Sequence, residues 1–260
     1  MGKSVAILCG GLGTRLREET EIKPKPMVAI GGRPILWHIM SIYAAQGFTD
    51  FVLCLGYKGS VIRDYFLNYK MQNANARVSL RSGAIEVLSN DAEIPDWTVT
   101  LVDTGDDSLT GTRLMKVLPF IKGDRFLATY GDGVADVDLK SLIATHEQGA
   151  KLATVTAVHP SSRFGELSLT GDMVKGFKEK PQVDQGWING GFFVLEKQAF
   201  TQAPKENFSL EGGLLEQLAD DDQLAVYRHH GFWQCMDTFR EMQLLNQLWD
   251  EGQAKWKVWS

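Results

Sequence analysis

The sequence predicts an α/β fold, with a mixed, mainly parallel β-sheet flanked by helices. Two observations lead to this expectation. Short, continuous apolar runs alternate with segments of helical periodicity, and short loops join them. Glycine-flanked loops follow two of the apolar runs, and parallel sheets bind ligands at the carboxyl ends of their strands. Hydrophobic residues make up 44% of the chain, so a sizeable core can form, and we expect one domain over residues 1–260.

The expected elements follow one another from the N-terminus. Residues 4–9 (SVAILC) form an apolar run that leads into glycines, which indicates a buried strand. Residues 34–45 have helical spacing, with a proline in the first turn and Gly47 as a possible cap. The same patterns predict strands over residues 50–55, 125–130 and 153–158, and helices over 61–69 and 139–148, the last capped by Asp136 or Asp138.

Two stretches interrupt the alternation of strands and helices. Residues 71–103 and 164–195 contain extended segments separated by turns, and we interpret both as β insertions around the open edge of the sheet. Residues 238–260 are expected to form a C-terminal helix and tail. Apolar side chains lie along one face of the helical pattern: Met242, Leu245 and Leu248 or Trp249.

Charge and composition exclude several classes of function. The net charge is -5, whereas a general nucleic-acid binder should be clearly basic, so we expect no nucleic acid as a partner. The chain lacks an apolar stretch of about 18 residues and its N-terminus does not fit a signal peptide, so we expect no membrane association and a cytoplasmic protein. The cysteines, Cys9, Cys54 and Cys235, are too far apart to predict a disulfide framework or a zinc site, and Cys54 is interpreted as a core residue.

A glycine-rich loop, GGLGTR, follows the first predicted strand at Gly10. Closely spaced glycines let backbone N–H groups turn toward an anion, because no Cβ blocks the approach. The loop lacks the Gly-Lys-Ser/Thr ending of a Walker A motif, and Leu16 stands where a dinucleotide fingerprint needs glycine. The loop alone could equally be a tight turn, but Arg15, Lys23 and Lys25 lie close by and favour phosphate binding.

Lys25 lies between two prolines in the stretch KPKP. Pro24 and Pro26 fix their own φ and favour extended conformations for Lys23 and Lys25. Such a braced segment can place an ammonium group with little loss of entropy, which suits the positioning and charge stabilisation of phosphoryl transfer. We therefore predict that the glycines hold a polyphosphate and that Lys25 steadies the reacting phosphorus. The alternative is a pair of solvated surface lysines.

The stretch from Gly10 to Pro26 resembles the N-terminal signature of the sugar nucleotidyltransferases, a GGxGTRL loop followed by a PKP-type lysine. The resemblance covers nearly the whole chain, although Cys9 stands where relatives usually carry alanine. It implies a Rossmann-like nucleotide-diphospho-sugar transferase fold and a homo-oligomer. The tryptophans of the tail then suggest a subunit contact, since aromatic residues favour interfaces, unless they pack on their own domain: Trp249, Trp256 and Trp259.

For the nucleotide, the resemblance implies binding along the glycine loop and after the strand that ends near residue 130. The residues implied there are Leu8, Gly10, Gly11, Gly13, Thr14, Arg15, Lys25 and Gly131. Residues 102–114 correspond to the base-reading loop of the family. The candidates in it for reading a pyrimidine edge are Thr104, Gly105, Gly111 and Arg113.

Nucleotide polyphosphates normally arrive with Mg²⁺, which binds carboxylate oxygens. In the family, an aspartate of a GD motif and a second aspartate near the C-terminus hold the metal, and Asp132 and Asp237 match both positions. Lys25, Arg15 and Asp132 are thereby implied as catalytic. Considered without the resemblance, Asp132 could be a turn residue and Asp237 a helix N-cap. The adjacent His229 and His230 are interpreted as structural, because neighbours on a strand face opposite ways.

For the sugar phosphate, the resemblance implies a pocket lined by the segments EKP and N-x-G. Glu179 and Asn189 would bind sugar hydroxyls, which need acceptors and mixed donors, and Lys180 would contact the phosphate. Gly190 would let the hexose approach the backbone.

Within the family, the chain is most similar to the cytidylyl branch, in stretches such as VTLVDTGDDSLTGTRL, TYGDGVADVD and GFWQCMDT. The implied reaction is a Mg²⁺-dependent, in-line attack of α-D-glucose 1-phosphate on the α-phosphate of CTP, giving CDP-glucose and pyrophosphate for bacterial surface polysaccharides. Two alternatives stay open. One is a uridylyl- or thymidylyltransferase on the same sugar phosphate. The other is a catalytically silent sugar-nucleotide-binding subunit, which should have lost Lys25, Asp132 or Asp237.

Overall fold

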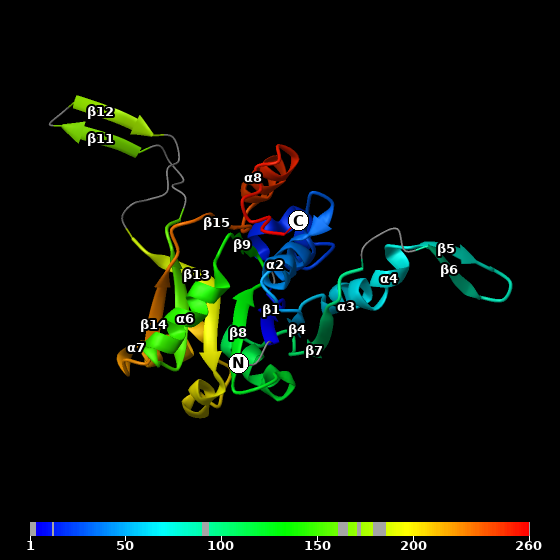
Figure 1. The fold of residues 1–260 in the computed structure, drawn as a ribbon, viewed down its shortest axis with the longest axis horizontal. Coiled ribbons are helices and arrows are strands. Elements are labelled where there is room, and N and C mark those ends of the chain that lie inside the picture. The colour runs from blue at the N-terminus through cyan, green and yellow to red at the C-terminus, as the bar shows by residue number, and fades with distance from the viewer. Residues whose placement is uncertain are drawn as a thin grey trace.

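The computed structural model of the chain describes residues 4–11, 13–89, 94–160, 166–170, 173–178 and 186–259. Within them, a seven-stranded sheet forms the centre, with strand order β14-β10-β13-β8-β1-β4-β7 (Figure 1). Its strands are β1 (Ser4–Leu8), β4 (Asp50–Leu55), β7 (Thr98–Asp103), β8 (Arg125–Tyr130), β10 (Ala153–Val158), β13 (Ile188–Glu196) and β14 (Leu224–Arg228).

The pairing of the strands is mixed and mainly parallel, as predicted. β1 is parallel to both β4 and β8, β7 is parallel to β4, and β14 is parallel to β10. β13 runs antiparallel between β8 and β10. All five residues of β1 are buried, which explains why its sequence is a continuous apolar run rather than an alternating one.

Helices cover both faces of the sheet. Val5 and Ile7 of β1 belong to one apolar cluster, and Ala6 and Leu8 belong to another, because successive side chains of a strand point to opposite faces. The first cluster includes side chains of α2 (Ile35–Ala44), α6 (Leu139–Gly149) and α8 (Phe239–Asp250). The second includes side chains of α5 (Thr110–Val117), α7 (Glu216–Asp220) and the π-helical segment η5 (Leu210–Leu215).

Shorter elements connect these layers. The remaining helices are α1 (Arg17–Thr20), α3 (Gly59–Leu67) and α4 (Tyr69–Gln72), with 3₁₀ turns η1 (Thr14–Leu16), η2 (Lys25–Met27), η3 (Leu118–Phe120) and η4 (Lys197–Gln202). Two small antiparallel pairs join β2 (Ala29–Ile30) to β3 (Arg33–Pro34) and β9 (Gly133–Ala135) to β15 (Trp233–Cys235). Among the described residues, no helix has the length and hydropathy needed to cross a bilayer.

The local predictions are largely confirmed. Asp138 caps α6 by accepting hydrogen bonds from the backbone N–H groups of Lys140 and Ser141, so it is Asp138 rather than Asp136 that starts this helix. Gly47 follows α2 with a φ of +89°, a conformation that glycine adopts easily. Cys54 is fully buried in β4, and burial raises the pKa of its thiol to about 12.

Both predicted β insertions are shorter than expected. The extended segments at the C-terminal ends of 71–103 and 164–195 are β7 and β13, which belong to the main sheet. A local pattern of extended residues cannot reveal this, because the partner strands lie far away in the sequence. The remaining segments form two-stranded hairpins: β5 (Asn75–Val78) with β6 (Ile85–Ser89), which projects from the body beside α4 (Figure 1), and β11 (Glu166–Thr170) with β12 (Met173–Lys178).

The C-terminal tail packs on its own domain rather than presenting its tryptophans to a partner. Trp256 is fully buried, its indole N–H lies 3.4 Å from Nδ1 of His38 in α2, and its ring packs against Phe232. The rings of Trp259 and Trp37 meet edge to face at 5.7 Å. The sequence pattern could not distinguish these contacts from a subunit interface, because both favour aromatic residues.

His38 makes the stability of this packing depend on pH. Its Nε2 lies 2.9 Å from the carbonyl oxygen of Ile30, and burial lowers the pKa of His38 from 6.5 to about 4. Because the unfolded chain binds the proton more readily, the stability that the neutral ring contributes is present above the unfolded pKa and is lost as the pH falls through the folded pKa. Lowering the pH from about 7 to about 4.5 should cost about 2–3 kcal/mol through this residue.

Urea denaturation of the wild type and of His38→Gln at both pH values measures this cost. The variant should lose less unfolding free energy on acidification, and His230→Gln, which changes an exposed histidine, should behave as the wild type does. Equal acid sensitivity of the wild type and His38→Gln would contradict the assignment.

Candidate active site

A cavity of about 490 Å³ opens at the carboxyl edge of the parallel strands, as predicted for this fold. The glycine loop after β1, the start of α5, the end of β8, η5 and the segment before α8 all contribute to its wall. The predicted site residues that line it are Leu8, Gly10, Gly11, Gly13, Thr14, Arg15, Lys25, Arg113, Gly131, Asp132 and Asp237.

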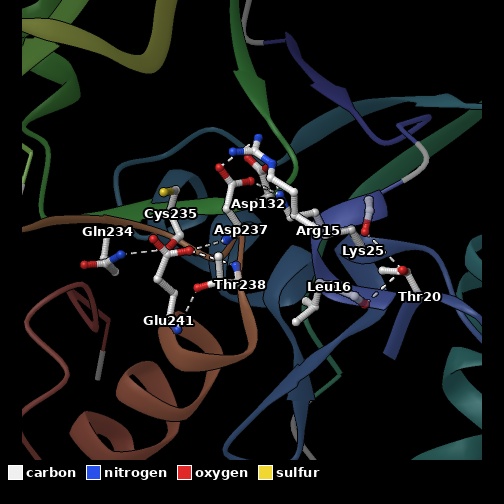
Figure 2. A network of polar contacts seen from close by, with 11 residues as sticks. Arg15, Leu16, Thr20, Lys25, Asp132, Gln234, Cys235, Asp237, Thr238 and Glu241 are labelled. Carbon is white, nitrogen blue, oxygen red and sulfur yellow. Dashed lines mark hydrogen bonds and ion pairs between the residues drawn. The ribbon is translucent and has the colours of Figure 1, made fainter. Parts of the chain in front are cut away.

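Lys25 lines this cavity and lies between two carboxylates (Figure 2). Its ammonium group is 2.7 Å from Oδ2 of Asp132 and also contacts Oδ1 of Asp237. The Arg15 guanidinium is 3.1 Å from the other oxygen of Asp237. The Lys25 side chain is 12% exposed, whereas that of Arg15 is 68% exposed, so Lys25 is held in place and Arg15 remains accessible to a ligand.

The local conformation of Lys25 differs from the prediction. Pro24 is extended, with φ −67° and ψ 150°, but Lys25 itself begins the 3₁₀ turn η2, which Val28 closes by donating its N–H to the Lys25 carbonyl. The preference of a residue before proline for an extended conformation is therefore overridden by this turn. Lys23, by contrast, pairs with Glu19 at 2.9 Å, which fits the alternative of a solvated surface lysine.

Two structural ties hold the aspartates beside each other. β9 follows Asp132 and β15 precedes Asp237, and their pairing places Gly133 opposite Cys235. The backbone N–H of Met236 also donates to the carbonyl of Asp132 at 2.8 Å. Residues distant in the sequence thus become neighbours at the end of the sheet.

Asp237 is not the helix cap that its sequence position allowed. Thr238 caps α8 in a capping box with Glu241, and Glu241 also accepts the backbone N–H of Asp237 at 2.7 Å. The Asp237 carboxylate therefore remains available for Lys25 and Arg15 (Figure 2).

The charges of the cluster suit a cation held between two carboxylates. Burial opposes the charge on Lys25, but Asp132 and Asp237 outweigh it and raise the pKa of the ammonium group. Because one ammonium contacts both carboxylates, their oxygens lie within about two hydrogen-bond lengths of each other. Carboxylate oxygens at this spacing fit Mg²⁺ with a modest adjustment. The described residues hold no group of three or more acidic, histidine or cysteine side chains for a metal, so phosphate and water oxygens would have to complete its shell.

Arg113 has a structural role in addition to lining the cavity, whereas the base contact predicted for it stays a prediction. Its guanidinium donates to the carbonyls of Leu55, Gly10, Gly105 and Asp106 and to the Thr104 hydroxyl, at 2.7–3.1 Å. The residue is 4% exposed. The guanidinium therefore joins the glycine loop, the end of β4 and the loop after β7, with most of its donors occupied.

These contacts of Arg113, which we call the Arg113 clamp, explain why residue 10 is a glycine. A Cβ on Gly10 would lie 2.2 Å from the guanidinium carbon of Arg113, so a larger residue would expel the arginine. Among the described residues other than its two chain neighbours, none has an atom within 4 Å of a Cβ placed on Gly11, so the absence of a side chain there leaves space within the cavity.

The other predicted base-contacting residues do not line the cavity. Thr104 is fully buried and donates its hydroxyl to the Leu55 carbonyl. Gly105 has a φ of +85° and receives Arg113 at its carbonyl. A Cβ on Gly111 would lie 2.2 Å from the Phe208 ring. The contacts of these three residues shape the loop, and their predicted role in reading the base stays a prediction.

The structure describes part of the predicted sugar-phosphate pocket, which we call the sugar side of the site. Asn189 and Gly190 are described, whereas Glu179 and Lys180 lie outside the described residues. The Asn189 amide nitrogen donates to the Tyr130 hydroxyl at 3.1 Å, and its oxygen accepts the backbone N–H of Gly191 at 2.9 Å. A Cβ on Gly190 would lie 2.6 Å from the Val158 side chain, so packing against β10 requires this glycine. Its predicted contact with a hexose stays a prediction.

His229 has the structural surroundings that were expected. Its Nε2 lies 3.1 Å from the Phe232 carbonyl and 3.0 Å from Oδ1 of Asp136. Sequence reasoning missed several residues of the cavity wall: Cys9, Pro26, Ser108, Leu109, Thr110, Tyr130, Ser209 and Glu211. Residues 208–216 carry no motif that could have indicated a site, and Tyr130 adjoins the GD motif that did.

Comparison with known proteins agrees with this geometry. Residues 4–239 match the family model described as nucleotidyl transferase. The chain belongs to the nucleotidyl transferase family. It is similar to the glucose-1-phosphate cytidylyltransferase of Salmonella typhimurium, with 48% identity over 254 residues that cover 97% of this chain and 98% of the relative. It is also similar to the D-glycero-alpha-D-manno-heptose 1-phosphate guanylyltransferase of Campylobacter jejuni, with 31% identity covering 81% and 84%.

Solved structures share the nucleotidyl transferase fold. HddC from Yersinia pseudotuberculosis in complex with GMP-PN has a TM-score of 0.69 at 23% identity and covers 96% of this chain and 100% of its own. The inositol-1-phosphate CTP transferase from T. maritima has a TM-score of 0.63 at 15% identity and covers 100% and 98%. The Rossmann-like, mainly parallel sheet predicted from the sequence is thereby confirmed.

The clamp role of Arg113 predicts that Arg113→Lys chiefly destabilises the protein. Lysine has three donors on one atom and cannot bridge the same set of acceptors, so the unfolding free energy should fall by about 2–4 kcal/mol. Thermal denaturation measures the change, with Arg81→Lys on the exposed turn of the β5–β6 hairpin as the matched control. A variant with wild-type stability but altered choice between nucleotides would instead support the base contact.

Proposed function

We propose that this chain transfers a cytidylyl group from CTP to α-D-glucose 1-phosphate, giving CDP-glucose and pyrophosphate. The observation that carries this proposal is the 48% identity, over 97% of the chain, to a glucose-1-phosphate cytidylyltransferase. The cluster of Lys25, Asp132 and Asp237 in a cavity behind a glycine loop supports the same chemistry.

The reaction is a single in-line displacement at the α-phosphorus of CTP. An ionised phosphate oxygen of the sugar phosphate forms a bond to this phosphorus, and the bond to the bridging oxygen of the β-phosphate breaks. Pyrophosphate leaves with the bonding electrons. The attacking oxygen carries a negative charge already, so no general base is required.

The protein contributes position and positive charge. Lys25 neutralises charge that builds up on the α-phosphoryl oxygens, by exchanging its carboxylate partners for phosphate. The exposed guanidinium of Arg15 and the backbone N–H groups of the glycine loop hold the departing pyrophosphate. The cavity is large enough for a nucleotide, and Gly11 leaves room for a phosphate close to the backbone.

Nucleotidyl transferases of this family generally use a divalent metal ion. We propose that Mg²⁺ is the ion here, and that Asp132 and Asp237 hold it. When bound, it supplies positive charge against the phosphates of both substrates. The carboxylates of Asp132 and Asp237 share one cation already, the Lys25 ammonium.

We also propose that the protein is cytoplasmic and acts as a homo-oligomer. The support for an oligomer is the β5–β6 hairpin, which exposes Val78, Leu80, Ile85 and Val87 and projects from the body (Figure 1). A lone two-stranded hairpin is marginally stable in water, so burial of these side chains against a second copy would stabilise it. Light scattering of the wild type and Leu80→Glu tests this, because the variant should have the smaller mass.

Release of pyrophosphate with Mg²⁺ and glucose 1-phosphate tests the reaction and the role of Lys25. CTP should support release, and UTP, dTTP, ATP and GTP should not. Lys25→Ala should lower kcat on the order of a hundredfold or more, since it removes a charge aimed at the reacting phosphorus. Lys23→Ala removes the neighbouring surface lysine and should stay within about fivefold of the wild type.

Release with UTP or dTTP alone would replace the cytidylyl assignment with one of its alternatives. Release with none of the nucleotides would favour the silent sugar-nucleotide-binding subunit. A Lys25→Ala protein that turns over at the wild-type rate would contradict the role given to Lys25.

A further inference from the structure

Tyr130 occupies a position between the aspartate cluster and the sugar side of the site. It ends β8, two residues before Asp132. Its ring packs edge to face on Phe193 at 5.6 Å, and a Cβ on Gly191 would lie 2.4 Å from it. Contacts with β13 thus hold the ring in place and fix the position of its hydroxyl.

The hydrogen bonds of this hydroxyl have a defined direction. The Tyr130 hydroxyl contacts Oε1 of Glu211 and Nδ2 of Asn189. A carboxylate can only accept, so Tyr130 donates its single proton to Glu211. Burial and the neighbouring Glu211 raise the pKa of Tyr130, which keeps this proton in place. Toward Asn189 the hydroxyl must therefore accept.

This direction determines how the Asn189 amide is oriented. Its nitrogen faces the Tyr130 hydroxyl at 3.1 Å, and its oxygen accepts the Gly191 N–H at 2.9 Å. Both contacts require the same orientation, and a flipped amide would lose both. Among the described residues, the second N–H of this amide has no acceptor, so it is available to a ligand.

Glu211 is itself held on its other side. Its Oε2 accepts the hydroxyl proton of Thr110 at 2.8 Å, and the Thr110 oxygen accepts the backbone N–H of Leu210 at 2.7 Å. Within the part of the chain that the structure describes, the ion pairs do not include Glu211. Its half-buried carboxylate accepts hydrogen bonds from two neutral hydroxyls in the wall of the cavity, those of Thr110 and Tyr130.

We propose that Glu211 is a positioning residue, which sets the orientation of the Asn189 amide through the Tyr130 hydroxyl. We call this chain of hydrogen bonds, from Glu211 through Tyr130 to Asn189, the relay. It makes Asn189 present an N–H donor, and so selects an acceptor oxygen on the sugar phosphate. This inference rests on the proposed function for the identity of the ligand, whereas the relay itself is a property of the protein. Thr110 anchors the carboxylate at the start of α5, so Thr110, Glu211 and Tyr130 lie in the cavity wall, and Asn189 adjoins them through the Tyr130 hydroxyl.

Steady-state kinetics of Glu211→Ala, Tyr130→Phe and the double variant test the relay. Each single variant should raise KM for glucose 1-phosphate about tenfold, since it releases one oriented hydrogen bond, and should leave KM for CTP nearly unchanged. The double variant should be no worse than either single variant, because both changes break the same chain of contacts. Glu216→Ala, at the exposed start of α7, is the matched control and should resemble the wild type.

Two kinetic outcomes would overturn the relay. Multiplying effects in the double variant would show that Glu211 and Tyr130 act separately. A loss in Glu211→Ala with a silent Tyr130→Phe would show that Glu211 meets the substrate directly.

A measurement without substrate separates this inference from the proposed function. The side-chain amide signals of Asn189 in a ¹⁵N-correlated NMR spectrum, assigned with Asn189→Ala, should shift in Tyr130→Phe and in Glu211→Ala but not in Glu216→Ala. Unchanged signals in Glu211→Ala would overturn the relay even in an active enzyme. Shifted signals in a protein that releases no pyrophosphate would support the relay and contradict the function.

Discussion

The shared contact of the Lys25 ammonium with Asp132 and Asp237 is the constraint on which the site depends. Two carboxylates at this separation repel each other unless a cation lies between them. The fold brings them together nonetheless, through the pairing of β9 with β15. The capping box uses Thr238 and Glu241, so the Asp237 carboxylate is not needed to cap α8 and can contact Lys25. The 3₁₀ turn that begins at Lys25 completes the cluster from a third segment. In the proposed mechanism, phosphate groups of the nucleotide would replace the two carboxylates at Lys25, and Asp132 and Asp237 would then be available to hold the metal ion.

Arg113 and Glu211 show how the wall around this cluster is made rigid. Arg113 donates hydrogen bonds to backbone carbonyl groups of three segments, which would otherwise lack partners beside the cavity. The absence of a side chain at Gly10 leaves space for its guanidinium. The Glu211 carboxylate acts as an acceptor instead, and receives hydrogen bonds from the hydroxyls of Thr110 and Tyr130. Both charged groups are satisfied by neutral partners, so each fixes loop geometry without neutralising the other charges of the site.

Much of this architecture could be predicted from the sequence because its causes are local. The apolar runs of β1, β4 and β8 reflect burial on both faces, and the glycine loop and Lys25 carry a specific signature. Asp132 and Asp237 were implied by the family resemblance, not by their local sequence. What depends on distant partners could not be predicted. β7 and β13 looked like parts of insertions, and the pattern left open whether Trp256 belonged to an interface or to the core of its own domain. The structural contacts of Arg113 could not be predicted, and Glu211 carried no motif, because the groups that they contact come from other segments.

Binding of Mn²⁺ in the absence of nucleotide, followed by electron paramagnetic resonance, tests the central claim most directly. If the Lys25 ammonium and a divalent cation compete for Asp132 and Asp237, Lys25→Met should bind Mn²⁺ at least about tenfold more tightly than the wild type, because the emptied carboxylates then attract another cation. Lys23→Met should bind Mn²⁺ as the wild type does. Equal or weaker binding by Lys25→Met would contradict the claim that the two carboxylates form the cation site.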